Sequence, residues 1–517
     1  MQTRRAFLRQ ASLAITSLGT MSMQTGQCAG NPVAHSSPAS TPNVVFIQCD
    51  QLNARALGCY GGEVDTPHID RLAKEGVRFT NAACVTPFCS PSRATWITGM
   101  YPHAHGIVGN VPYGGKGQLG IADEDVTTER ILNESGYATH HYGKWHLTGT
   151  PSYYPDMYRN QIQYPQEMAQ VFSEVTKMDR AQWMKWYAWN LPVTVSDAVK
   201  DNSKNLKLGT YHDFIAKMGR LDLPVEQNCD VRVCDNAVEA IKTNRGRPFM
   251  VTASFNYPHD PNVVPLPYYD MFDPDKVTLA DSRDIREKRF DRDWSRHIVT
   301  ALNEPGLREF IRIYYAMVKL IDDQVGRLLQ ALEETGQLEN TVIIFAADHG
   351  DMMSGHGMVW KSTSSFYDDI VRVPLMIRYP KRFKAQICDM AVDFTDFMPT
   401  ILALTGRSIP QQVQGQNLVP YLAGQSDQTQ ARQYSFTERV TRHKQGLRKV
   451  EPGTNASFCV RGQGYKYCKY PSQEYLYDLK RDPGEETDCV NDPLYKERLE
   501  IMRTELANWL KRTNWTG

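Results

Sequence analysis

Apolar runs of strand length alternate with amphipathic stretches along most of the chain. The run NVVFIQC before Asp50 and the run from Val342 to Ala347 contain almost no polar position, as expected for strands buried on both faces. A 3.6-residue period from Phe310 to Thr335 predicts a long helix, and a shorter helix is expected from Pro67 to Gly76. This alternation predicts an α/β fold with a large, mostly parallel sheet that is flanked by helices.

Three regions depart from this pattern. Arg4 and Arg5 precede an uncharged, mildly apolar stretch, which is typical of a twin-arginine export signal and predicts a periplasmic or secreted bacterial protein. A polar, aromatic region interrupts the main domain, and short strands followed by an amphipathic helix end the chain. The expected organisation is an export signal at 1–30, a linker at 31–41, a main domain at 42–440 with an insertion at 150–230, and a smaller α+β subdomain at 441–517.

Composition excludes several classes of protein. The formal net charge is zero and charged residues make up 22% of the chain, so no nucleic-acid partner is expected. The apolar stretch near the N-terminus, residues 11–23, is too short for a stable membrane span. Eleven cysteines occur without any CxxC pair, which excludes zinc-ribbon and thioredoxin-like sites and leaves disulfide pairing open.

Reactive side chains follow four of the predicted strands. Because ligands bind at the carboxyl ends of strands in open α/β sheets, these groups are expected to meet. Carboxylate, amide and imidazole groups of this kind suit a hard divalent cation, with Ca²⁺ preferred and Mg²⁺ or Mn²⁺ as alternatives. The competing interpretation is that they cap loops and pair with arginines. The strand-end residues are Asp50 and Gln51, Lys144 and His146, His259, and Asp348 and His349, of which Asp50, Gln51, Asp348 and His349 are the expected metal ligands.

The stretch CSPSR places a cysteine beside a predicted helix start. Pro91 fits the first turn of a helix, so Cys89 is expected just ahead of the N-terminus, where negative charge is favoured. Arg93 adds a fixed cation one turn later. An unmodified thiolate with His146 or His259 as its base fits this setting, but a soft thiolate is poorly matched to a hard cation. The residues alone leave that conflict open.

A series of ordered motifs resembles those of the type I sulfatase family, and together they cover most of residues 42–517 outside the insertion. The sequence CSPSR followed by Thr98-Gly99 is similar to the family's first signature, and GYATHHYGKWHL at 136–147 is similar to its second. The remaining matches, in the family's order, are Asp50-Gln51, PHDP around His259, DHGD at 348–351, Lys361 before the run VPLMIRYP, and EYLYDLKRDPGEE in the C-terminal subdomain.

The resemblance implies an alkaline-phosphatase-like fold and a sulfuric ester hydrolase of the arylsulfatase type. In that family a formylglycine-generating enzyme oxidises the cysteine of this motif, here Cys89, to formylglycine (3-oxoalanine), which replaces sulfur by oxygen at the metal. One hydroxyl of the hydrate would attack sulfur. The implied roles are sulfate binding by Lys144, Lys361, His259 and Asn110, general acid catalysis by His259, proton removal by His146 and support of the hydrate by Arg93.

Two residues depart from the family pattern. Gln51 replaces an aspartate found in many members, which lowers the ligand charge by one and also resembles choline-sulfatase-like and phosphonate monoester hydrolase relatives. His349 replaces the asparagine of several members.

The preferred substrate is a sulfated sugar or polysaccharide fragment. The insertion carries Trp183, Trp186 and Tyr187 on one helical face, and a core role is preferred there over a sugar platform. Alternatives are cleavage of phosphonate monoesters or phosphodiesters, a non-catalytic binding protein with a decayed site, and a cysteine hydrolase that uses unmodified Cys89.

Overall fold

The computed structural model describes residues 41–111, 120–122, 124–147, 192–200, 218–285, 287, 290, 293–440, 450 and 452–517. The expected export signal and all but the last residue of the linker lie outside the described residues. So do Trp183, Trp186 and Tyr187 of the insertion. From Thr41 to Gly517 the chain forms one compact unit.

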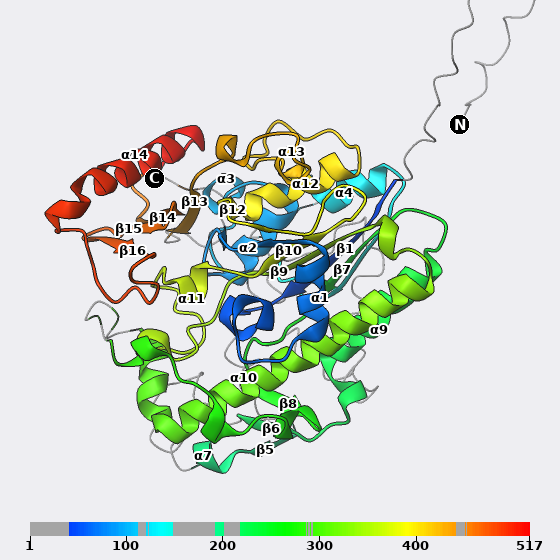
Figure 1. The fold of residues 1–517 in the computed structure, drawn as a ribbon, viewed down its shortest axis with the longest axis horizontal. Coiled ribbons are helices and arrows are strands. Elements are labelled where there is room, and N and C mark those ends of the chain that lie inside the picture. The colour runs from blue at the N-terminus through cyan, green and yellow to red at the C-terminus, as the bar shows by residue number, and fades with distance from the viewer. Residues whose placement is uncertain are drawn as a thin grey trace, which may run out of the picture. The chain divides into compact units, whose positions relative to one another are not determined.

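A seven-stranded mixed sheet forms the centre of this unit (Figure 1). Strands β4, β7, β1 and β9 run parallel, β10 is antiparallel to both of its neighbours, and β2 and β11 are parallel to each other. The predicted strand-like runs before Asp50 and Asp348 are β1 and β9. In sheet order the strands are β11 (Gln386–Cys388), β2 (Val77–Phe79), β10 (Leu375–Arg378), β9 (Thr341–Ala347), β1 (Asn43–Cys49), β7 (Phe249–Ser254) and β4 (Ala138–Gly143).

Helices cover both faces of the sheet (Figure 1). One layer contains α1 (Pro67–Glu75), α9 (Cys229–Thr243) and α10 (Trp294–Glu334), and the other contains α2 (Cys89–Thr98), α4 (Thr128–Glu134) and α12 (Phe397–Leu404). The expected α/β fold with a mostly parallel, helix-flanked sheet is confirmed. Its parallel strands bring four carboxyl ends to one edge, which is where ligands bind in such sheets.

The long helix α10 starts sixteen residues before the predicted Phe310, at Trp294. Asn303 has φ 52°, which is outside the helical region, and Pro305 follows it, so two helical segments join at a kink. The predicted end is confirmed: Thr335 caps the helix and Gly336 adopts the left-handed conformation, with φ 68°.

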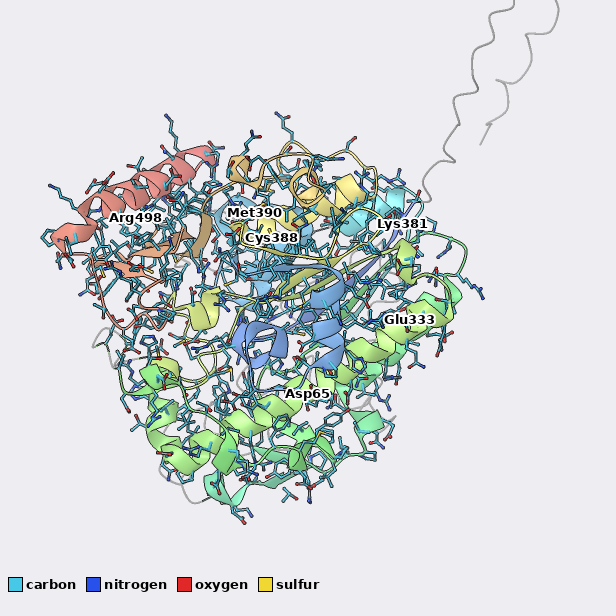
Figure 2. The ribbon with its side chains drawn as sticks, in the orientation of Figure 1. Asp65, Glu333, Lys381, Cys388, Met390 and Arg498 are labelled. Carbon is cyan, nitrogen blue, oxygen red and sulfur yellow. The ribbon has the colours of Figure 1, made fainter. Side chains whose placement is uncertain are left out.

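The core lies between the sheet and the helix layers. Phe46 of β1 packs edge-on against Trp96 of α2 and against Phe397 of α12, so the central strand holds both helices. Cys388 and Met390 are buried at and just beyond the edge strand β11 (Figure 2).

A second, antiparallel sheet of four strands precedes the last helix. Its strands are β13 (Ser435–Val440), β14 (Ala456–Gly462), β15 (Tyr465–Lys469) and β16 (Glu474–Asp478), followed by α14 (Lys496–Arg512). The first of these strands precedes residue 441, where the C-terminal subdomain was expected to begin. Short elements complete the unit: β3 (Ala82–Ala83), α3 (Pro102–His105), β5 (Val193–Val195), α7 (Asp197–Lys200), β6 (Gly219–Leu221), β8 (Val263–Pro265), α11 (Asp368–Val371), β12 (Val392–Asp393) and α13 (Val419–Leu422).

In the part of the chain that the structure describes, no helix combines the length and the apolar surface needed to cross a membrane.

Candidate active site

The four parallel strands end level with one another. Gly143 at the end of β4 pairs with Ser254 at the end of β7, and Cys49 at the end of β1 pairs with Ala347 at the end of β9. The residues that follow these strands therefore meet at one edge. Gly143 is required there, since it has φ 90° and a Cβ would lie 2.0 Å from the Ser254 carbonyl oxygen.

Arg93 links the two carboxylates at this edge. Its Nη2 donates to Asp50 Oδ2 and its Nε donates to Asp348 Oδ2, both at 3.0 Å, and all three side chains are buried. Arg93 thus occupies the outer oxygen of each carboxylate. The inner oxygens face His349 Nε2, which lies 4.0 Å from Asp50 Oδ1 and 3.8 Å from Asp348 Oδ1.

Cys89 lies at the centre of the site and is fully buried. It is the first residue of α2, with Phe88 as N-cap, and so begins the helix instead of preceding it as expected. Its Sγ lies 3.2 Å from His349 Nε2, 3.4 Å from Lys361 Nζ and 3.7 Å from Asp50 Oδ1. The side chains of His349 and Lys361 and the N-terminus of α2 all favour a negative charge on the Cys89 sulfur.

Lys144 and His146 reach Cys89 from the loop after β4. Lys144 Nζ lies 2.5 Å from Asp50 Oδ2 and 3.9 Å from the Cys89 sulfur, and the His146 ring hydrogen-bonds the Cys89 side chain. The Lys144 backbone is fixed as well, because its carbonyl accepts from Arg93 Nη1 at 2.8 Å and from Ser254 Oγ at 2.7 Å.

His259 and Lys361 form a second pair of basic side chains at the site. His259 Nε2 lies 2.8 Å from Lys361 Nζ, and the second ring nitrogen, Nδ1, lies 2.7 Å from the carbonyl oxygen of Asp260. Because a carbonyl can only accept, Nδ1 carries a proton and Nε2 is the atom presented to the site. Lys361 Nζ also approaches Gln51 Oε1 at 3.4 Å.

The Asn110 side chain lies beside the first turn of α2. Its Oδ1 accepts from the backbone N–H of Ser90 at 3.1 Å, so this side chain satisfies one of the free donors of the helix N-terminus beside Cys89. Ser90 Oγ in turn donates to the carbonyl of His146 at 2.6 Å. These two bonds join the segments that carry Cys89, Asn110 and His146.

The charges around Cys89 shift its ionisation. Burial opposes a thiolate, but Lys144, Lys361 and His349 together hold the pKa of Cys89 well below its usual range. Burial lowers the pKa of His146 to about 4, so this ring is neutral at pH 7. These shifts are of the kind found at reactive sites.

The two carboxylates respond in opposite directions. Burial and Cys89 raise the pKa of Asp50, but Lys144, His259 and Arg93 outweigh them and leave it below its usual range. Burial, followed by the nearby Asp50, raises the pKa of Asp348 to about 6. Asp50 is therefore the carboxylate that stays ionised most firmly.

The donor set fits a divalent cation. Ligand atoms of Asp50, Cys89, Asp348 and His349 all lie within 4.8 Å of one another. His349 Nδ1 lies 2.9 Å from the Gly350 carbonyl oxygen, which leaves Nε2 as the ligating nitrogen. Two carboxylate oxygens and one imidazole suit a hard or borderline ion, and an oxygen in place of the Cys89 sulfur would complete that match.

Several residues of the site were missed by the sequence interpretation. Ser254 Oγ accepts a hydrogen bond from Arg93 Nη1 at 2.8 Å. The Asp230 carboxylate on α9 accepts from the backbone N–H groups of Asn256 and Tyr257, which fixes the loop leading to His259. A serine that ends an apolar strand and an aspartate in the first turn of a helix are both common without any function. Neither position therefore carried a signal in the sequence.

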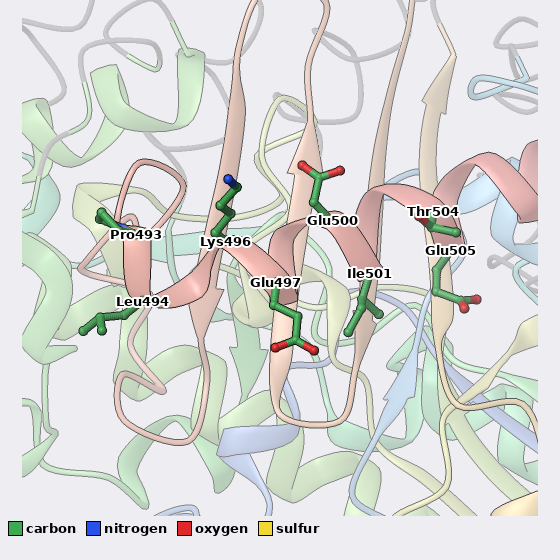
Figure 3. A pocket seen from close by; sticks show the side chains of 8 residues that line it. All are labelled: Pro493, Leu494, Lys496, Glu497, Glu500, Ile501, Thr504 and Glu505. Atoms are coloured by element: carbon green, nitrogen blue, oxygen red, sulfur yellow. The ribbon is translucent and has the colours of Figure 1, made fainter.

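One surface pocket lies away from this cluster. It encloses about 770 Å³ on α14 (Figure 3) and is lined by Pro493, Leu494, Lys496, Glu497, Glu500, Ile501, Thr504 and Glu505. None of the lining residues belongs to the cluster around Cys89.

Comparisons with known proteins agree with this geometry. Residues 42–407 match the family described as Sulfatase, and residues 356–512 match the one described as N-sulphoglucosamine sulphohydrolase, C-terminal. The Arylsulfatase of Clostridium perfringens is 27% identical over 498 residues, which cover 91% of this chain and 94% of the relative. The Delta 4,5-hexuronate-2-O-sulfatase of Bacteroides thetaiotaomicron is 29% identical over 509 residues, covering 91% and 89%.

Solved structures give the same result. A 2-O GAG sulfatase has a TM-score of 0.68 at 26% identity and covers 92% of this chain and 93% of its own. The phosphonate monoester hydrolase of Silicibacter pomeroyi has a TM-score of 0.70 at 22% identity, covering 91% and 96%, and shares the fold. With a family match over more than two thirds of its length, this chain belongs to the sulfatase family of the alkaline phosphatase superfamily and is a sulfuric ester hydrolase.

Proposed function

We propose that the protein releases inorganic sulfate from a sulfated sugar or polysaccharide fragment, with formylglycine made from Cys89 as its nucleophile and a bound divalent cation, Ca²⁺ in first place. The observation that carries the proposal is the position of the Cys89 side chain. Its sulfur lies 3.7 Å from Asp50 Oδ1 and 3.2 Å from His349 Nε2, and it lies 3.9 Å and 3.4 Å from the ammonium nitrogens of Lys144 and Lys361.

Asp50, Gln51, Asp348 and His349 would hold the cation, together with an oxygen at position 89. When bound, such a cation supplies Lewis-acid polarisation of the nucleophile and of the sulfate oxygens. Formylglycine supplies a hydrated aldehyde, in which one hydroxyl is the nucleophile and the other allows the aldehyde to re-form as sulfate leaves.

The remaining side chains bind charge and move protons. Lys144 and Lys361 would neutralise the sulfate oxygens, and Asn110 would orient the substrate. His259 Nε2 faces Lys361 Nζ, which can only donate, so a proton passed from Lys361 to Nε2 would allow His259 to protonate the leaving alkoxide. His146 is neutral because its pKa is about 4, which allows it to take the proton of the second hydroxyl at pH 7.

A carbohydrate substrate is supported by the relatives. One of them is named for a sulfated hexuronate and one solved structure for a sulfated glycosaminoglycan. The substrate panel for the test therefore varies the sugar, the position of the sulfated hydroxyl, and whether the sulfate lies at the end or in the interior of a polymer.

The test combines the mass of the Cys89 peptide with sulfate release. The protein would be produced with and without a formylglycine-generating enzyme, its expected maturation partner, and assayed on sulfated mono- and oligosaccharides. We expect a loss of about 18 mass units at residue 89 and sulfate release only in the co-produced sample. Cys89→Ala, produced in the same way, is the matched control and should be inactive.

Two other outcomes would redirect the proposal. Full activity of a protein whose Cys89 is unmodified and can be alkylated would favour the cysteine-hydrolase alternative. A higher kcat/KM on a phenyl phosphonate monoester than on any sulfate ester would favour the phosphonate hydrolase alternative, which the shared fold supports.

A further inference from the structure

We infer that Asp351 is a positioning residue that sets the orientation of the Gln51 amide, so that its carbonyl oxygen faces the cation site. The inference rests on the cation of the proposed function. Gln51 Nε2 donates to Asp351 Oδ2 at 2.8 Å, and both side chains are completely buried.

Asp351 offers the Gln51 amide a single oxygen atom as a partner. Its Oδ1 already accepts from the backbone N–H of Met353 at 2.8 Å, so only Oδ2 is directed at the amide. Oδ2 is the acceptor in this contact and the Gln51 NH₂ group is the donor, so the amide presents its nitrogen to Asp351. The amide oxygen is turned to the opposite side.

Lys361 selects the same orientation from that opposite side. Its Nζ lies 3.4 Å from Gln51 Oε1, and an ammonium group can only donate. A rotated amide would place an oxygen against the Asp351 carboxylate and an NH₂ group against the Lys361 ammonium. Both contacts would become repulsive, so the two neighbours fix one of the two amide orientations.

The backbone around this pair is also fixed. The Asp351 carbonyl accepts from Asn53 Nδ2 at 2.7 Å, which joins the loop after β9 to the loop after β1. The Gln51 N–H donates to Asp348 Oδ1 at 3.0 Å. A hard cation is coordinated by the amide oxygen of a glutamine and not by its amide nitrogen. The orientation of the Gln51 amide therefore decides whether Gln51 can be a ligand.

The test is a double-mutant cycle on the full chain, with Ca²⁺ affinity as the readout after the protein has been stripped with a chelator. In Asp351→Asn, the new Oδ1 must still accept from Met353, so Nδ2 faces Gln51 and turns the amide over. We expect Ca²⁺ affinity to fall about 10- to 100-fold, as for other groups that orient a ligand. In Asp351→Asn with Gln51→Glu, the new glutamate accepts from Asn Nδ2 and again offers an oxygen, so affinity should return.

The cycle separates positioning from a structural role. Gln51→Glu should raise Ca²⁺ affinity much more in the Asp351→Asn background than in the wild-type background, where it places two carboxylates side by side. Unchanged Ca²⁺ affinity of Asp351→Asn would overturn the inference, even with a lowered melting temperature in the stripped protein. So would an equal effect of Gln51→Glu in both backgrounds. A wild-type protein that binds neither Ca²⁺, Mg²⁺ nor Mn²⁺ would overturn the proposed cation itself.

Discussion

Arg93 donates hydrogen bonds to Asp50, Asp348, Ser254 and the Lys144 carbonyl from one buried guanidinium. Its planar fork allows it to hold the outer oxygens of two carboxylates at once, and a lysine ammonium cannot reproduce that geometry. At the residue scale, therefore, the arginine of the CSPSR motif sets the spacing of the expected metal ligands without being one of them.

Arg93→Lys should lower cation affinity about 10- to 100-fold, because at least one carboxylate loses the partner that orients it. The loss in kcat/KM should be at least as large. Calorimetric titration with Ca²⁺ and steady-state kinetics on the mature enzyme would measure both effects. Arg71→Lys is the control, since Arg71 forms partly exposed pairs with Glu75 and Glu333. Wild-type affinity in Arg93→Lys would contradict the role assigned here.

The sequence predicted the residues that follow strands better than those that support them. Asp50 and His349 were found because polar residues directly after buried apolar runs are conspicuous. Asp351 stands out only as the last residue of the DHGD motif, and Tyr314 occupies a core position of a long helix, so neither position signalled its contact with Gln51. The roles of Asp351 and Tyr314 depend on contacts between segments that are far apart in the sequence, and a local sequence pattern does not indicate such contacts.

At the scale of elements, helix α10 holds the turn that follows β1. Gln51 has φ 64°, a left-handed conformation that costs a non-glycine residue about 1–3 kcal/mol. The Tyr314 hydroxyl donates to the Gln51 carbonyl at 2.7 Å and accepts from the Asn53 N–H at 2.9 Å. The helix was predicted from its apolar period, whereas its extension to Trp294 was missed because Pro305 and Gly306 are typical of a helix end.

Tyr314→Phe should destabilise the folded protein by about 2–6 kcal/mol, because it leaves two buried backbone groups without their partner at about 1–3 kcal/mol each. The melting temperature in a calorimetric scan should fall, and cation affinity should fall with it as the turn relaxes. Tyr315→Phe, one residue further along the same helix and also buried, is the matched control. An equal, small effect of both substitutions would show that the hydroxyl of Tyr314 does not hold the turn.

At the scale of the whole described unit, buried charges join the main sheet and the C-terminal sheet. Arg461 and Lys466 of β14 and β15 both pair with Asp368 of α11, and Lys466 also pairs with Glu485 at 2.7 Å. These pairs fix the antiparallel sheet against the loop between Lys361 and β10. Removing one partner of such a pair is costly because the other charge stays buried.

A second junction depends on a protonated histidine. His103 of α3 places Nδ1 at 2.7 Å from Glu438 Oε2 of β13 and Nε2 at 3.1 Å from the Thr513 carbonyl oxygen, after α14. Both partners can only accept, so both ring nitrogens donate and the imidazole carries a positive charge. The ring is enclosed by Trp509 and Trp515. Burial opposes the charge, but Glu438 outweighs it and raises the pKa of His103 above its usual value.

His103→Gln should therefore lower stability in a pH-dependent way. The raised pKa in the folded state means that the stabilisation by His103 is complete below about pH 6.5, the ordinary histidine value, and is lost as the pH rises through the folded-state pKa. Melting temperatures at pH 6 and pH 9 would show a larger gap between wild type and His103→Gln at the lower pH. His297→Gln, at an exposed position of α10, should show no such gap. A gap that stays constant across this range would mean that His103 joins the two parts of the molecule as a neutral ring.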